Sequence, residues 1–208
     1  MQEVAPKRRA DTRERLLAAA ESAVLEKGFG ATSIDELIAA VGITKSGFFY
    51  HFPDNVALAQ ALLERYIDRE DALFDALFAR ADALHDDPLH GFLIWLKLLA
   101  EVLEDLPGGH PGCLVAAYCC QDNLFNREVR ELNRTAVLAW RSRFRERLER
   151  IAARYPPRSD VDLDALADML SALADGGIIL SKVTQDRTAL PKQILLYRDY
   201  LRLVFLGP

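Results

Sequence analysis

The sequence predicts an all-α protein of about nine helices, and three observations carry that prediction. Apolar side chains recur at three- and four-residue spacing along nearly the whole chain, as they do on one face of a helix. No segment shows the strict alternation of apolar and polar residues that a half-buried strand needs. Glycine, proline and capping residues divide the helical pattern into separate segments.

The first 54 residues are predicted to hold three helices. Gly28 ends the first helix. Ser33, with Glu36 three residues later, forms a capping box that opens the second. Gly42 supplies the tight turn before the third. The predicted helices are Asp11 to Lys27, Ile34 to Val41 and Lys45 to Phe52.

Residues 55–208 are predicted to form a second, larger helical domain, so we place a domain boundary between residues 54 and 55 (1–54 and 55–208). Asp54 is a suitable N-cap for a long fourth helix, whose apolar pattern continues to Leu77. Proline and glycine separate the later helices. These are expected near Leu89–Leu106, Leu114–Gln121, Glu128–Arg154, Leu163–Lys182 and Pro191–Leu206.

Composition restricts the classes of function. A net charge of −5 argues mildly against nucleic acid as a partner, but basic residues gather near the start of the chain. They are Lys7, Arg8, Arg9, Arg13 and Arg15. No apolar run approaches the roughly 18 residues of a membrane-spanning helix, and the polar start predicts no secretory signal. Three cysteines match no zinc spacing, so we expect a cytoplasmic protein with no metal and no cofactor.

The segment from Ser33 to Phe52 has the dimensions of a helix-turn-helix, whose second helix enters the major groove of DNA. Its apolar residues would pack the helices together and leave the N-terminal end of the second helix exposed. Small hydroxyl residues, a cation and a glycine at that end permit close approach to a duplex. These residues are Thr44, Lys45, Ser46 and Gly47. A plain helical hairpin within a bundle is the alternative that geometry alone leaves open.

Two stretches, GFGATSIDEL (28–37) and VGITKSGFFYHFP (41–53), resemble the DNA-binding domain of the TetR family of transcriptional regulators. The resemblance covers roughly residues 10–60, and Tyr50-His51-Phe52 is its most specific part. It implies an N-terminal three-helix domain with a helix-turn-helix that binds double-stranded operator DNA. It also implies a C-terminal helical domain for ligand binding and dimerisation.

The resemblance implies roles for particular residues. The implied contacts are Thr32, Tyr50 and His51 to phosphate, and Thr44, Lys45, Ser46 and Gly47 to base edges, with Phe29 and Phe52 in the core. Family members often have tyrosine where this chain has Phe49 and lysine where it has Asn55, so two phosphate contacts are missing. We expect Lys7, Arg8 and Arg9 to take up part of that backbone binding.

The last two predicted helices, Leu163–Lys182 and Pro191–Leu206, are unusually apolar. Their stripes are Leu163, Leu166, Leu170 and Leu173, then Ile194, Tyr197, Leu201 and Phe205. Gly176-Gly177 costs about 1 kcal/mol per residue relative to alanine, which predicts a close helix crossing there. By resemblance these helices form a homodimer interface; burial within one monomer is the alternative.

The resemblance further implies an effector pocket inside the helical domain. Aromatic and amphipathic side chains suit a small, partly apolar ligand, although ordinary core packing is the alternative for each. The candidates are Tyr66, Trp95, Cys113, Tyr118, Gln121, Phe125, Trp140 and Phe144. Gly112-Cys113-Leu114 resembles the start of the sixth helix in one subgroup, where some members respond to electrophiles or oxidants, and a cysteine near a helix N-terminus can be reactive.

The sequence thus predicts a dimeric repressor of TetR type that a small effector releases from a pseudo-palindromic operator. The alternatives are a TetR-type activator and an adaptor or chaperone-like dimer that keeps the fold without operator binding. An enzyme is not expected, because no phosphate-binding loop, nucleophile elbow or metalloprotease helix is present. Metal-type ligands occur between His85 and His90, but we interpret that stretch as a solvated linker.

Overall fold

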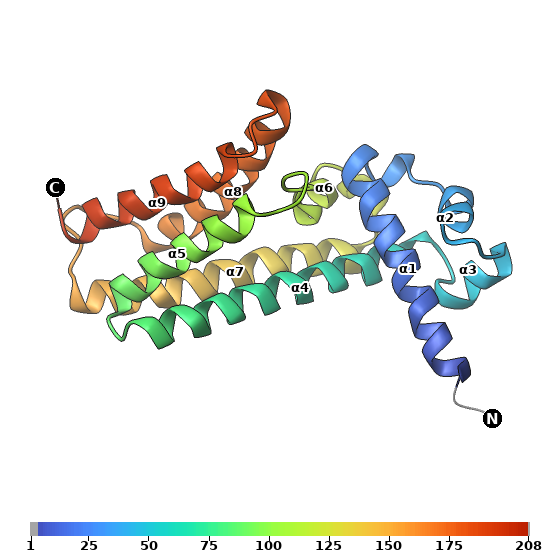
Figure 1. Ribbon diagram of the computed structural model, residues 1–208, viewed down its shortest axis with the longest axis horizontal. Coiled ribbons are helices and arrows are strands. Elements are labelled where there is room, and N and C mark those ends of the chain that lie inside the picture. The colour runs from blue at the N-terminus through green and yellow to red at the C-terminus, as the bar shows by residue number, and fades with distance from the viewer. Residues whose placement is uncertain (1–3, 208) are drawn as a thin grey trace. The chain divides into compact units, whose positions relative to one another are not determined.

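The computed structural model describes the backbone of residues 4–207 and the side chains from residue 10 onward (Figure 1). Within that range all regular structure is helical and no strand occurs, which confirms the all-α prediction. The helices are α1 (Val4–Lys27), η1 (Phe29–Ala31), α2 (Ile34–Val41), α3 (Lys45–His51), α4 (Asn55–Leu84), α5 (Pro88–Glu104), α6 (Leu114–Cys119), η2 (Asp122–Leu124), α7 (Arg127–Arg154), α8 (Leu163–Thr184) and α9 (Ala189–Phe205), where η marks a 3-10 turn.

Several helix ends differ from the sequence prediction. α1 begins at Val4 rather than Asp11, because lysine, arginine and alanine form helix without needing an apolar face. α6 ends at Cys119 rather than at the predicted Gln121, and the 3-10 turn η2 follows it at Asp122–Leu124. α9 begins before Pro191, which lies in the first turn, where a missing N–H costs no helical hydrogen bond.

The chain forms two compact units. Unit 1 consists of the residues up to Asp68 together with Pro111–Ala136, and therefore holds α1, α2, α3 and α6. Unit 2 consists of Arg69–His110 and the residues from Val137 onward, and holds α5, α8 and α9. α4 and α7 are continuous helices that contribute residues to both units.

The core of unit 1 joins the three N-terminal helices to the first part of α4. Its fully buried members include Leu16, Leu17, Leu37, Phe48 and Leu62. At its edge, Arg65 of α4 donates to Glu14 of α1 at 2.5 Å and also to Glu21 of the same helix. Because Glu21 is almost fully buried, this arrangement fixes α1 against α4.

The core of unit 2 is built on aromatic rings. Phe78 stacks on Trp95 with 4.4 Å between ring centroids, and Phe74 meets Trp95, Trp140 and Phe144 edge-on. Edge-to-face and offset-stacked pairs add stability beyond the burial of their area.

The crossing of α8 and α9 explains one of the two adjacent glycines. A Cβ atom on Gly177 would lie 2.9 Å from the Cα of Leu190, closer than real side chains approach a backbone. Gly176 has no neighbouring atom within 4 Å of such a Cβ. The predicted close crossing is therefore confirmed for Gly177 but gives no reason for Gly176.

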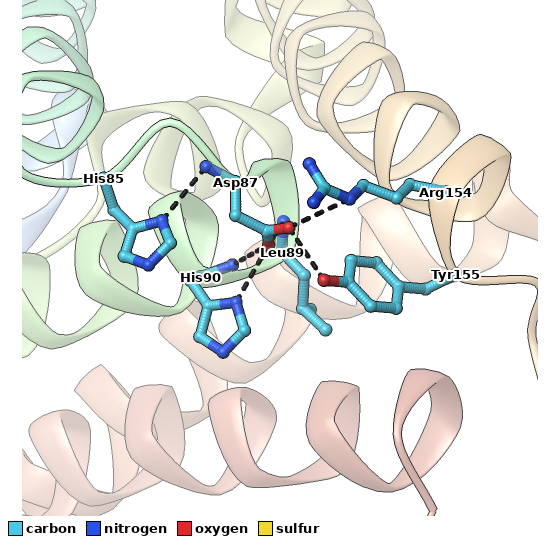
Figure 2. Close-up of polar contacts among 6 residues, drawn as sticks. All are labelled: His85, Asp87, Leu89, His90, Arg154 and Tyr155. Carbon is cyan, nitrogen blue, oxygen red and sulfur yellow. Dashed lines mark hydrogen bonds and ion pairs between the residues drawn. The ribbon is translucent and has the colours of Figure 1, made fainter.

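Asp87 shows that the solvated-linker interpretation is wrong for this residue (Figure 2). Only 7% of Asp87 is exposed. Its carboxylate caps α5 by accepting from the backbone N–H groups of Leu89 and His90, both at 3.0 Å, and it also accepts from the Tyr155 hydroxyl at 2.7 Å. Burial raises the pKa of the carboxyl, but these hydrogen bonds and the charge of Arg154 outweigh it and hold the pKa well below its usual range.

Candidate DNA-binding surface and effector region

The N-terminal end of α3 is held by a capping interaction inside the expected recognition segment. Thr44 is the N-cap, and its hydroxyl accepts from the backbone N–H of Gly47 at 3.2 Å. The same hydroxyl lies 3.0 Å from the Ser46 hydroxyl. A Cβ on residue 47 would approach the Thr44 oxygen to 3.3 Å, so Gly47 leaves room for the cap. The glycine thus has a local structural role besides any close approach to DNA.

Most of the side chains expected to contact DNA lie on the surface of unit 1. The side chain of Lys45 is 65% exposed, and its ammonium lies 3.6 Å from the carboxylate of Asp35, which is still more exposed. Tyr50 is 60% exposed, while Thr32 and His51 are half-buried. Thr32 donates to the Gly28 carbonyl at 3.0 Å, which ties the start of α2 to the end of α1.

The positions that depart from the family pattern are also on the surface. Phe49 is 41% exposed and meets the buried Phe48 ring edge-on. Asn55 is exposed at the first position of α4, and Asp54 caps that helix by accepting from Ala57 N–H at 2.7 Å. Lys7, Arg8 and Arg9 belong to the α1 backbone, but their side chains lie outside the described residues, so their proposed role stays a prediction.

Three of the expected effector residues hold the turn between α1 and α2. The side-chain oxygen of Gln121 accepts from the backbone N–H of Phe29 at 2.8 Å and of Gly30 at 3.3 Å. The rings of Tyr118 and Phe125 stack on each other, with centroids 4.4 Å apart, and both meet Phe29 edge-on. We call Tyr118, Gln121 and Phe125 the Phe29 clasp.

Two further features fix the clasp in place. The Tyr118 hydroxyl donates to the Ala59 carbonyl of α4 at 2.8 Å, and burial raises the pKa of this phenol. Gly28 adopts φ +86°, and a Cβ there would lie 2.5 Å from the Gln121 amide nitrogen. Glycine is the residue that suits position 28, because the backbone there has a positive φ and because Gln121 approaches too closely for a Cβ atom. No local sequence pattern indicates this contact, since 91 residues separate the partners Gly30 and Gln121.

The other effector candidates fall into two groups. Trp95, Trp140 and Phe144 lie together in unit 2 around Phe74, and the Trp140 indole donates to Asp71 at 3.2 Å. Tyr66 is buried in unit 1. Cys113 is the N-cap of α6, where its sulfur accepts from Ala116 N–H at 3.4 Å.

The apolar stripes expected at a dimer interface are mostly buried within unit 2. Leu166, Leu170, Ile194 and Leu201 are almost inaccessible, and Tyr197 donates to the Leu166 carbonyl. Other faces of α8 and α9 carry exposed apolar side chains, which the periodicity of the sequence did not indicate. They are Ile179, Leu180 and Val183 on α8, and Leu196, Tyr200 and Leu203 on α9.

The described residues contain neither a candidate membrane-spanning helix nor a candidate metal site. No helix there is long and apolar enough to span a membrane. Nor does that part of the chain bring three or more His, Cys, Asp or Glu side chains together in a group that could hold a metal ion.

Comparisons with known proteins agree with this architecture. Residues 16–62 match the family model described as bacterial regulatory proteins, tetR family. The chain is 26% identical over 183 residues to the HTH-type transcriptional regulator LmrA of Bacillus subtilis, covering 86% of this chain and 91% of LmrA. It is 34% identical over 82 residues to the HTH-type transcriptional repressor BepR of Brucella suis, covering 39% and 37% of the two chains.

A solved structure shares the fold along nearly the full length. A TetR-family transcriptional regulator from Agrobacterium tumefaciens aligns with a TM-score of 0.76 and 19% identity, covering 95% of this chain and 99% of the other. The relatives are named as regulators of transcription, in agreement with the expectation that the chain is not an enzyme. The matching domain and the curated relatives identify the chain as a transcriptional regulator of the TetR family, whose fold it shares along nearly its full length.

Proposed function

We propose that the protein is a homodimeric repressor, which binds a pseudo-palindromic operator and leaves it when a small, partly apolar effector binds. Residues 1–54 would form the DNA-binding domain and residues 55–208 the effector-binding and dimerisation domain. One observation carries the proposal: α3 buries Phe48 beneath it while presenting Lys45, Ser46 and Tyr50 outward. A packed face with an opposite polar face is what a helix needs to enter the major groove.

The exposed apolar side chains of α8 and α9 support the dimer. Val183 is 78% exposed, Ile179 62% and Leu196 59%. The four-residue spacing puts Ile179 and Val183 on one face of α8, and exposed apolar faces mark interaction sites in soluble proteins. A two-fold dimer would present two copies of α3, and such a protein requires an operator with matching two-fold symmetry.

Release of the operator requires a structural connection between the effector region and the recognition helix. Two contacts within unit 1 are candidates for this connection. Arg65 pairs α4 with Glu14 and Glu21, so a tilt of α4 would carry α1 with it. The Phe29 clasp joins α6 and η2 to the turn before α2. An effector that binds best when these elements are displaced would shift the population away from the operator-binding state.

A binding titration tests the proposal. The purified protein is titrated against the intergenic DNA upstream of its own gene and against a scrambled duplex, at two salt concentrations. We expect tight binding to the upstream fragment alone, with an affinity that falls as salt rises because phosphate contacts release counterions. Equal, weak binding to both duplexes, with no tight site elsewhere in the regulated region, would favour an adaptor that has kept the fold but lost operator binding.

A further inference from the structure

A groove of about 500 Å³ lies between α5 and α9 in unit 2, apart from the effector candidates discussed above. On α5 its lining includes His90, Ile94, Lys97 and Glu101, whose three- and four-residue spacing puts them on one face. Arg198 and Arg202 of α9 line the other side, and Leu206, directly after the helix, continues their four-residue spacing. The volume falls within the usual range for sites that bind small molecules.

The groove is positively charged although the chain as a whole is acidic. Lys97, Arg198 and Arg202 line it, while Glu101 is the one carboxylate among its described lining residues, which leaves an excess of two positive charges among these four residues. Glu101 accepts from the Lys97 ammonium at 2.8 Å, and this hydrogen bond lowers its pKa. Asp199 lies outside the lining, 3.6 Å from one Arg198 nitrogen and 3.9 Å from one of Arg202.

Arg198 carries a donor that the protein leaves unused. Its Nε atom is buried and has no hydrogen-bond partner among the described residues. An unpaired buried donor is costly, and such groups in native proteins often mark the place of a missing partner. Guanidinium groups are suited to carboxylates and phosphates, which accept two parallel hydrogen bonds. Because the Nε atom itself has almost no accessible surface, the terminal guanidinium nitrogens of Arg198 and Arg202 are the groups that would meet an anion in the groove.

Two histidines add hydrogen-bonding groups to one part of the groove lining (Figure 2). The backbone N–H of Asp87 donates to Nδ1 of His85 at 3.0 Å, so the neutral His85 ring carries its proton on Nε2. The His90 Nδ1 atom lies 2.9 Å from the ionised Asp87 carboxylate, to which it donates. The rings stack with centroids 5.0 Å apart, and both turn their Nε2 edges away from Asp87. Nε2 of His85 thus offers a further donor for an acidic ligand.

The rest of the lining is apolar. Leu93, Ile94, Leu98 and Leu206 supply hydrocarbon surface next to the cations. We propose that the groove binds a small organic anion: a carboxylate on Arg198 and Arg202, with an apolar body along the leucines. This ligand site is separate from the effector pocket, and the proposal does not depend on operator binding.

Calorimetric titration with octanoate tests the proposal, with 1-octanol as a neutral match and acetate as an anion without an apolar body. We expect octanoate to bind at least about tenfold more tightly than either compound. Arg198→Gln should weaken octanoate binding by about tenfold or more, and Arg202→Gln should weaken it as well. Arg150→Gln is the matched control, because Arg150 is exposed and lines a different groove, between α4 and α7.

The outcomes separate clearly. Equal binding of octanoate and octanol, or no octanoate binding to the wild-type protein, would overturn the proposal. Wild-type affinity in both Arg198→Gln and Arg202→Gln would do the same, because the anion would then bind elsewhere. If Arg198→Gln fails to fold, the exposed Arg202 still provides a test, judged against Arg150→Gln.

Discussion

Lys45 is the residue best placed to read a base. It stands at the first position of α3 and is largely exposed, with only a loose ion pair to Asp35. We expect Lys45→Ala to weaken operator binding by about 1–3 kcal/mol, with a much smaller loss on random DNA. Paired titrations against both duplexes measure the difference. An equal loss on both would assign the lysine to a phosphate instead.

Asp87 makes a residue-scale contribution to stability that depends on pH. Asp87→Ala removes the α5 cap and leaves the Tyr155 hydroxyl without its acceptor, so we expect a loss of about 1–3 kcal/mol in the free energy of unfolding at pH 7. The exposed neighbour Asp86 provides the matched control, and Asp86→Ala should change stability by less than about 0.5 kcal/mol.

The sign of the pH dependence follows from the lowered pKa of Asp87. A carboxyl whose pKa is lower in the folded state stabilises the protein above its unfolded pKa of about 3.9, and this contribution is lost as the pH falls toward the folded value. Urea unfolding should therefore show the gap between wild type and Asp87→Ala shrinking below about pH 4. A gap that stays constant down to pH 2.5 would contradict the role of the ionised carboxylate.

At the scale of elements, the α8–α9 crossing leaves no room for a side chain at Gly177 but does not restrict the adjacent Gly176. Gly177→Ala forces a methyl group against the Leu190 backbone, so we expect a loss of about 1–3 kcal/mol. Gly176→Ala meets nothing within 4 Å and should be neutral or stabilise by up to about 1 kcal/mol, since alanine favours helix. Thermal unfolding of the two variants compares them directly, and equal melting temperatures would refute the packing argument.

The Phe29 clasp links the helix-turn-helix to α6 and η2. Gln121→Ala removes the acceptor of two backbone N–H groups and frees the turn that leads into α2. We expect operator affinity to fall about fivefold, corresponding to roughly 1 kcal/mol for the lost hydrogen bonding. Asn123→Ala is the control, because Asn123 is an exposed amide two residues away. Should the two variants bind the operator equally well, the clasp does not position the DNA-binding helices.

Local sequence signals predicted the helices more reliably than the contacts between them. Ser33, Gly42 and Asp54 occupy the predicted capping and turn positions, because such signals act within a few residues of the chain. The Gln121–Phe29 contact and the buried Asp87–Tyr155 pair join distant segments and had no local signature. The periodicity of α8 and α9 located their buried stripes, but the exposed faces with Val183 and Leu196 became visible only in the folded chain.

At the scale of the whole molecule, the proposed function requires two copies of the chain on one operator. Val183 is the most exposed of the large apolar side chains on α8 and α9, whereas Leu84, 61% exposed, ends α4. A glutamate within a dimer interface would have to lose its hydration, so Val183→Glu should yield monomers that bind the operator weakly. Leu84→Glu is the matched control and should remain dimeric.

The most direct measurement is the mass of the protein–DNA complex in solution, taken together with a footprint on the upstream fragment. We expect an even number of chains on each duplex and a two-fold symmetric footprint, both lost in Val183→Glu and kept in Leu84→Glu. A single chain bound to an asymmetric footprint, or a Val183→Glu complex identical to that of the wild type, would contradict this expectation.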